Sequence, residues 1–154
     1  MEEIYRIIYA GTSDQLNELI RSGTNINIQD RDKRTPLIQA AIDNKVEMAR
    51  LLIQNGANIN FQDSQGYSAL HYAAQNFSID MCELFLESNA IIDIQDNHGN
   101  TPLSRAVFNS HGRGEVIKVL IEHGADINLG NRHGVSPLQL AKKIANYNEL
   151  QFLE

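Results

Sequence analysis

The stretch from Thr101 to Asp126, which reads T-P-L-S-R-A-V-F-N-S-H-G-R-G-E-V-I-K-V-L-I-E-H-G-A-D, contains the unit from which the chain is built. Its opening triplet, Thr or Ser followed by Pro or Ala and then Leu, starts at positions 35, 68, 101 and 136, at intervals of 33, 33 and 35 residues. A column of Gly or Asn at positions 23, 56, 89 and 124 keeps the same intervals. A period of this length indicates stacked structural repeats rather than one ordinary globular domain.

Each unit has the pattern of two short helices and a turn. The Thr or Ser hydroxyl caps free amides, and Pro is tolerated at the first helical position. Apolar residues at i, i+3 and i+4, as in Leu37, Ala40 and Ala41, predict the first helix. A second helix is predicted to end at the Gly or Asn column, because both residue types accept a left-handed conformation. Asp and Gly at fixed offsets in segments 58–66 and 93–99 predict a tight turn that projects from the helices.

These residues resemble the ankyrin repeat. The likeness rests on the period, on the start S-A-L-H-Y-A-A at 68–74, and on the end G-A-D-I-N at 124–128, and it covers essentially the whole chain. It implies an all-α repeat fold, an ankyrin-repeat solenoid of stacked helix-turn-helix units with β-hairpin-like loops at right angles to them. It also implies a shallow concave face that binds other proteins.

The repeats divide a single domain of residues 1–154 into five units. We expect an N-terminal capping repeat at 1–34, full repeats at 35–67, 68–100 and 101–135, and a truncated C-terminal capping repeat at 136–154. Glu18 and Lys142 stand where inner repeats carry apolar residues, and terminal repeats need polar outer faces for solubility. We therefore expect a complete array that is monomeric when unbound.

Composition limits the partners. The net charge of -6 argues against nucleic acid and favours a basic protein partner. No apolar run has the roughly 18 residues of a membrane span, and the first three residues lack the pattern of a secretory signal. One cysteine excludes an internal disulfide and fits a reducing compartment. The sequence thus favours a cytoplasmic protein.

Residues that carry chemistry are sparse. Cys82 shares a column with Leu16, Ala49 and Ile117, so we expect it to be a small buried hydrophobe rather than a nucleophile. His98 and His133 lie on successive loops without further residues at zinc-binding spacing. No phosphate-binding motif is present. We expect no catalytic residues, no metal and no cofactor, whereas the resemblance gives His71 a structural hydrogen bond to the preceding loop.

Three departures from the pattern stand out. Lys33 replaces the turn glycine seen at positions 66, 99 and 134, so we expect the first loop to be looser or differently bent. Phe77 stands between two helices in the column of Gly11 and Asn44, with no evident packing role. The unit of 35 residues places two extra residues near 110–114, where we expect a bulged loop that is either a recognition feature or a tolerated insertion.

Candidate partner-binding residues are those whose columns vary while the framework stays fixed, because the resemblance places them on the concave face. On the loops they are Arg31, Asp32, Arg34, Ser64, Gln65, Tyr67, Asn97, His98, Asn100, Arg132, His133 and Val135. On the exposed ends of the first helices they are Asp43, Asn76, Phe108 and Asn109. Tyr67 and Phe108 are the expected energetic anchors, since aromatic residues and Arg dominate hot spots. The competing interpretation of each residue is plain solvated surface.

The function predicted from the sequence is non-enzymatic protein binding. One specific form is a stoichiometric inhibitor that covers a basic enzyme, as an immunity protein neutralises a nuclease-type toxin. An alternative is an adaptor, scaffold or secreted effector that joins proteins. An enzyme is the least favoured class, because it requires a pocket with convergent polar groups.

Overall fold

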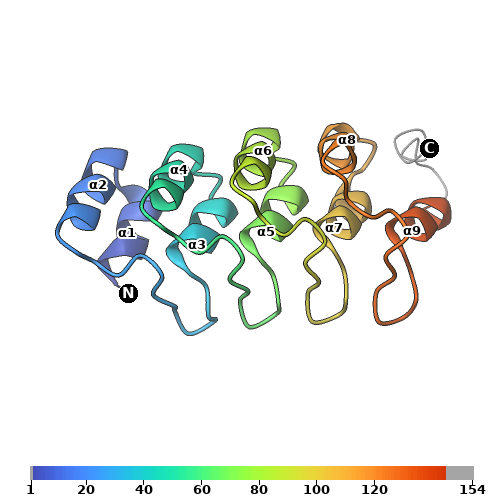
Figure 1. Cartoon of the computed structure of the whole chain (residues 1–154), viewed down its shortest axis with the longest axis horizontal. Coiled ribbons are helices and arrows are strands. Elements are labelled where there is room, and N and C mark those ends of the chain that lie inside the picture. Colours follow the sequence, from blue (N-terminus) through green and yellow to red (C-terminus); the bar gives the residue numbers. More distant parts are fainter. Residues whose placement is uncertain (1, 145–154) are drawn as a thin grey trace.

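The computed structural model describes residues 2–144 as a stack of helix pairs (Figure 1). The helices are α1 (Glu3–Ala10), α2 (Ser13–Arg21), α3 (Pro36–Ile42), α4 (Val46–Gln54), α5 (Ala69–Gln75), α6 (Ile79–Glu87), α7 (Pro102–Asn109), α8 (Glu115–Glu122) and α9 (Pro137–Lys143). Within residues 2–144 no strand is formed, and the predicted all-α repeat solenoid is confirmed. No helix in this range is long and apolar enough to cross a bilayer.

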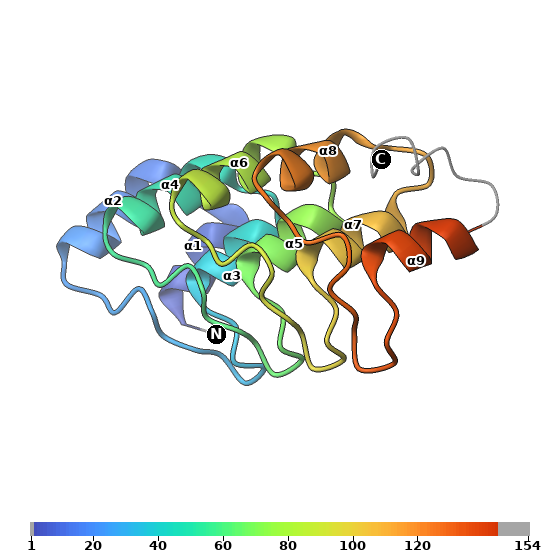
Figure 2. The same cartoon turned by 45° about the vertical axis from the view of Figure 1, so that its right-hand side comes forward.

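The helices form two rows. The odd-numbered helices pack side by side in one row, the even-numbered helices form the second row behind them, and the loops project from the first row (Figures 1 and 2). Within residues 2–144, α1 to α8 contact their partners in the same repeat, and neighbouring helices of each row contact one another. The second half of the predicted closing repeat, residues 145–154, lies outside the described residues.

Hydroxyl caps start the first helices as the sequence predicted. Thr35 accepts a hydrogen bond from the backbone N–H of Ile38, and Thr101 accepts one from that of Ser104. Ser68 and Ser136 form reciprocal capping boxes with the residues three positions later. Helix α1 is different, because Glu2 precedes it without any side-chain capping bond. The Thr or Ser column therefore marks the starts of α3, α5, α7 and α9.

The core is built from small residues between first helices and larger ones in the second row. Ala40, Ala73 and Ala106 are fully buried, which lets the first helices approach closely, and Phe85 fills the second row. Cys82 is 0% exposed, and burial, aided by the nearby Glu83 carboxylate, raises the pKa of its thiol to about 12. The prediction that Cys82 is a buried hydrophobe is confirmed, since a thiol with this pKa is neutral at physiological pH.

The projecting loops are hairpin-shaped and joined to one another. In each loop a backbone bond closes five residues, as between the Asp63 N–H and the Tyr67 carbonyl at 3.0 Å. A further backbone bond links each loop to the next: Ser64 donates to Asp32 at 2.8 Å, Asn97 to Gln65 at 3.0 Å and Arg132 to His98 at 3.0 Å. The four loops thus form one hydrogen-bonded ladder across the repeats.

The expectation of a looser or differently bent first loop is wrong. Lys33 has a φ of 60°, close to the 80° of Gly66 and Gly99, and its N–H donates to the Asp30 carbonyl at 3.0 Å. The Asp30 side chain holds this turn as its counterparts hold theirs, by accepting from Asp32 N–H and Arg34 N–H. A non-glycine residue is therefore held in the left-handed region.

We expect Lys33→Gly to raise the free energy of unfolding by about 0.5–1 kcal/mol. Glycine removes the left-handed penalty of roughly 1–2 kcal/mol. Part of this gain is lost, because glycine loses more backbone conformational entropy on folding than lysine does. Urea unfolding followed by circular dichroism measures the change, and Lys45→Gly, at a negative φ, is the control that should only destabilise. A Lys33→Gly variant no more stable than wild type would show that this turn carries no strain.

The insertion lies where the sequence predicted, and it has a contact that the sequence did not indicate. Five residues separate α7 from α8, against three between α3 and α4. Arg113 in this insertion lies over the Phe77 ring, 4.0 Å from its centroid. Phe77 itself has a φ of 56° and packs against the core. The aromatic ring thus supports the inserted loop of the following repeat through a cation–π contact.

Candidate functional site

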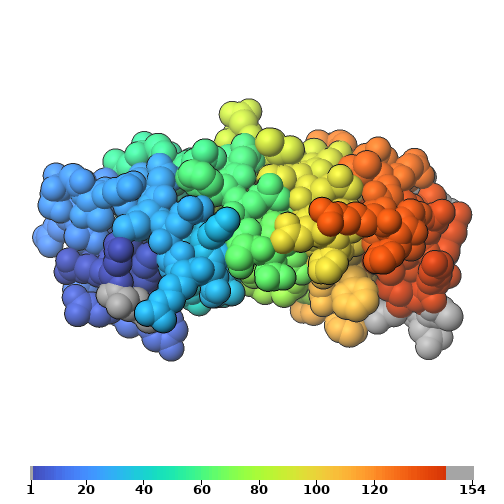
Figure 3. All heavy atoms as spheres, turned by 90° about the horizontal axis from the view of Figure 1, so that it is seen from below, coloured from blue at the N-terminus to red at the C-terminus, as the bar shows by residue number. Residues whose placement is uncertain are grey.

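The candidate site is the face formed by the loops and the first helices, seen from the loop side in Figure 3. None of the predicted partner-binding residues is buried. The exposed ones are Arg31, Asp32, Ser64, Gln65, Asn76, Asn97, His98, Phe108, Arg132 and His133. The half-buried ones are Arg34, Asp43, Tyr67, Asn100, Asn109 and Val135. Phe108 is 60% exposed and is the largest apolar side chain among them.

At the middle of the face, Tyr67 is engaged by its own chain. Its ring stacks on His71 with centroids 5.4 Å apart, and the Arg105 guanidinium lies 4.6 Å from its centroid. Burial raises the pKa of Tyr67, although the positive charge of Arg105 opposes the shift. The phenol is therefore neutral at physiological pH, and only part of the ring is open to a partner.

His71 links two repeats. Its Nδ1 accepts from the Ser68 N–H at 3.1 Å, at the end of the preceding loop as expected, and its Nε2 lies 3.0 Å from the Asn100 carbonyl in the following loop. This second bond was not predicted. Since Nδ1 is an acceptor, Nε2 carries the hydrogen and donates it to Asn100.

An Asp or Asn at the base of each loop organises its turn. Asp63 Oδ1 accepts from the N–H groups of Gln65 and Tyr67, each at 2.9 Å. The same pair of bonds, to the residues two and four positions later, is formed by Asp30, Asp96 and Asn131. Because Asn131 makes these bonds as well as the carboxylates do, the turn needs the Oδ1 acceptor and not the charge.

At the two inner junctions, the first-helix residue nine positions after this Asp donates a hydrogen bond to its second carboxylate oxygen, Oδ2. Tyr72 OH donates to Asp63 Oδ2 at 2.6 Å. Arg105 donates to Asp96 Oδ2 through both Nε, at 3.2 Å, and Nη2. Each side chain thereby closes the junction between two adjacent first helices.

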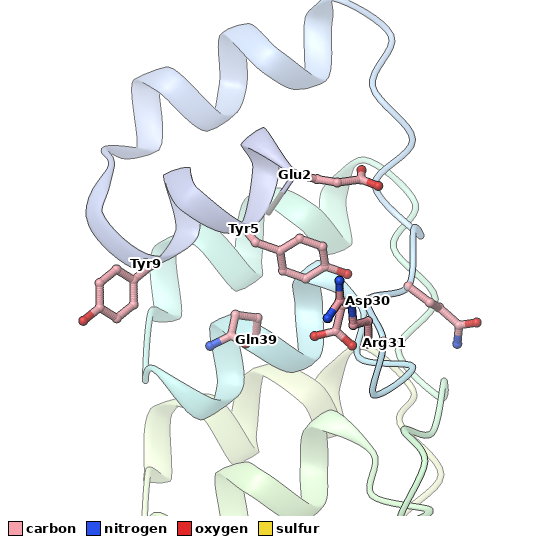
Figure 4. Close-up of a pocket in the computed structure, with 7 residues that line it drawn as sticks. Glu2, Tyr5, Tyr9, Asp30, Arg31 and Gln39 are labelled. Carbon is pink, nitrogen blue, oxygen red and sulfur yellow. The ribbon is translucent and has the colours of Figure 1, made fainter.

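The end junctions lack this closure. Gln39, nine positions after Asp30, instead donates to Asp43 at 2.8 Å, and Leu140, nine positions after Asn131, has no donor. A pocket opens at each place. The first has a volume of about 510 Å³ and is lined by Glu2, Tyr5, Tyr9, Gln29, Asp30, Arg31 and Gln39 (Figure 4). The second, of about 290 Å³, is lined by Asn100, Ser104, Arg105, Phe108, Asn131, His133, Val135 and Leu140.

A family model described as ankyrin repeats (3 copies) matches residues 4–96 and 78–131. The chain belongs to the ankyrin-repeat family. Members of this family generally act as modules for protein–protein interaction, typically without enzymatic activity. Among curated proteins, none matches this chain.

The two end pockets of the ankyrin stack occupy equivalent positions but differ in chemistry. Tyr9 and Phe108 are counterparts on α1 and α7, as are Asp30 and Asn131 on the loops. In the first pocket burial, followed by the Asp30 charge, raises the pKa of Tyr5 to about 12, and its hydroxyl donates to the carbonyls of Ile28 and Arg34. The first pocket therefore combines carboxylates with aromatic rings, whereas the described lining of the second has no carboxylate and comprises two amides, a hydroxyl, Arg105, His133 and three apolar side chains.

The sequence reasoning overlooked the residues that open these pockets. Tyr9, Asp30, Gln39 and Leu140 were not among the candidates. The signal that could have found them is the spacing of nine between each turn Asp or Asn and a first-helix residue, which gives Asp–Gln, Asp–Tyr, Asp–Arg and Asn–Leu pairs along the chain. Among residues 2–144, no group of three or more His, Cys, Asp or Glu side chains could hold a metal ion.

Proposed function

We propose that the protein binds another protein, of basic character, on the face formed by its loops and first helices, and that it inhibits this partner by covering it. The observation that carries this proposal is the loop ladder. It presents exposed side chains that differ from repeat to repeat, such as Arg31, His98 and Arg132, on a backbone already held by hydrogen bonds. A preorganised surface loses little conformational entropy on binding.

The dimensions of this face suit a protein partner. Five first helices spaced by about 8–10 Å make a surface roughly 40 Å long. That length supports a standard interface of about 800 Å² on each partner. Phe108, which is exposed and lines the pocket between α7 and α9, is the side chain we expect to serve as the main anchor there.

Charge supports a basic partner and an inhibitory role. The net charge of -6 steers encounter with a positively charged surface and disfavours acidic competitors. An enzyme that handles nucleic acid must keep a basic substrate path, and an acidic protein lying across that path would block it. We therefore propose an immunity-type protein that acts in the cytoplasm as a monomer until it binds a nuclease-type toxin.

The face can be tested by a triple variant, Gln65→Ala, Phe108→Ala and His133→Ala. All three residues are exposed and lie on this face, so the fold should persist while the affinity for the partner falls at least about 30-fold, the loss expected for one hot spot. Affinity capture from the native cell measures partner retention, and titration of the purified partner measures inhibition. We expect the partner's activity to reach zero at one equivalent of wild-type protein.

A matched variant on the second helices and their following turns provides the control. Gln54→Ala, Ile91→Ala and His123→Ala remove one amide, one exposed apolar side chain and one imidazole away from the face. Loss of the partner by both triple variants, or by neither, would reject this face. An adaptor would instead hold two proteins at once without lowering the activity of either, and an assay for a ternary complex separates it from an inhibitor.

A further inference from the structure

We infer that the pocket between α1 and α3 receives the positively charged end of an Arg or Lys side chain from the partner, which pairs with Asp30. This inference rests on the proposed function and specifies its chemistry. The junctions between first helices repeat the same arrangement along the stack and differ at Asp30.

The inner junctions show what each turn carboxylate binds. Asp63 Oδ2 receives a phenol from Tyr72, and Asp96 Oδ2 receives a guanidinium from Arg105. Asp30 occupies the same position and uses Oδ1 for its turn in the same way. Among residues 2–144, however, no first-helix side chain donates to Asp30, because Gln39 is bonded to Asp43 along α3. The α1–α3 junction therefore has the carboxylate acceptor of Asp30 but, among the described residues, no first-helix side chain that donates to it.

The space left at Asp30 suits a cation. The pocket of about 510 Å³ also contains Glu2, whose carboxylate is exposed and makes no capping bond, and the ring of Tyr9, which is 70% exposed. Figure 4 shows Tyr9 and Tyr5 on α1, with Asp30 on the facing loop. An aromatic face and carboxylates together favour a positively charged group over a neutral one.

Arg31 is the opposing charge at this pocket. Its side chain is exposed on the loop, and within the described residues it forms no ion pair with Asp30 or Glu2. The carboxylates of Glu2 and Asp30 together with the one guanidinium of Arg31 give the pocket lining a net negative charge. The Arg105–Asp96 pair, in which a side chain 18% exposed lies against a fully buried one, shows that this type of junction accommodates a guanidinium.

The test uses a random peptide library displayed on phage and selected on the full chain. We expect peptides with an enriched Arg or Lys. One selected Arg peptide and its citrulline counterpart, which is uncharged and of similar shape, are then titrated by calorimetry against wild type and Asp30→Asn. The variant should preserve the turn, as Asn131 does in the last loop, and should bind the Arg peptide about 10- to 100-fold more weakly. The citrulline peptide should bind both proteins equally.

Asp80→Asn, an equal charge change at an exposed position on α6, is the matched control and should leave both affinities unchanged. Equal losses for the Arg and citrulline peptides, or an equal effect of Asp80→Asn, would overturn the inference. Peptides that lose affinity with Phe108→Ala but not with Asp30→Asn would also overturn it while leaving the proposed function intact. A library without enrichment rejects the cation site and leaves the proposed function to the capture experiment.

Discussion

Asp96→Ala is expected to lower the free energy of unfolding by about 3–5 kcal/mol, the usual cost of removing one partner from a buried ion pair. The substitution removes the acceptor for the N–H groups of His98 and Asn100 and leaves the half-buried Arg105 guanidinium without its carboxylate. Denaturant unfolding measures the loss. The cation–π contact of Arg105 with Tyr67 is too weak to compensate.

Asp96→Asn separates the turn from the charge. Asn131 shows that an amide oxygen can hold the same turn, so the amide variant should keep the turn bonds, lose the ion pair alone, and be destabilised less than the alanine variant. Burial alone would raise the pKa of Asp96, but the bonds from Arg105, Asn100 and His98 outweigh it and keep this pKa below its usual value. The stability due to this carboxylate is therefore complete above pH 3.8 and is lost as the pH falls toward the lowered pKa. Equal losses for Ala and Asn would show that the ion pair, not the turn, dominates.

His71→Ala is expected to cost about 3–4 kcal/mol. The ring is 0% exposed, so its removal leaves a cavity, and it also breaks the bonds to Ser68 and to the Asn100 carbonyl of the next repeat. His71→Gln is the graded control, because Gln139 forms the same capping box with Ser136 in the last described helix. We expect the Gln variant to keep the cap, lose the link between repeats, and fall between the other two in chemical denaturation.

The same residue should make stability depend on pH near neutrality. Burial lowers the pKa of His71, although the Asn100 carbonyl opposes the shift. The unfolded chain therefore binds this proton at a higher pH than the folded chain does. Stability from the neutral ring is complete above pH 6.5 and declines as the pH falls from 6.5 toward the lowered pKa. A stability profile in this range that is the same for wild type and His71→Gln would contradict this assignment.

The period, the helix starts and the burial of Cys82 could be predicted from sequence because each is fixed by local chemistry. A hydroxyl three residues before a free amide, or an apolar column at i, i+3 and i+4, acts within one repeat. The error at Lys33 has a complementary cause. The missing glycine predicts a changed turn, whereas the hydrogen bonds of the Asp30 side chain hold the turn in the same form and keep Lys33 at a positive φ.

Contacts between repeats were harder to predict. The bond from His71 to Asn100 spans 29 residues, and the contact of Arg113 with Phe77 joins two loops whose separation depends on how the helices stack. Variation between columns marks exposed positions such as Phe108. It does not mark Asp30, which shares its residue type with Asp63 and Asp96 and differs only in lacking a donor.

The regular spacing of the first helices fixes the distance between the two open junctions. The two open junctions, at α1–α3 and α7–α9, lie three helix spacings apart, or about 24–30 Å. An extended polypeptide of about seven to nine residues covers that distance. A shorter segment can occupy one junction but not both. The number of inner junctions closed by residues such as Tyr72 and Arg105 therefore sets the minimum length of a ligand that binds both open junctions at once.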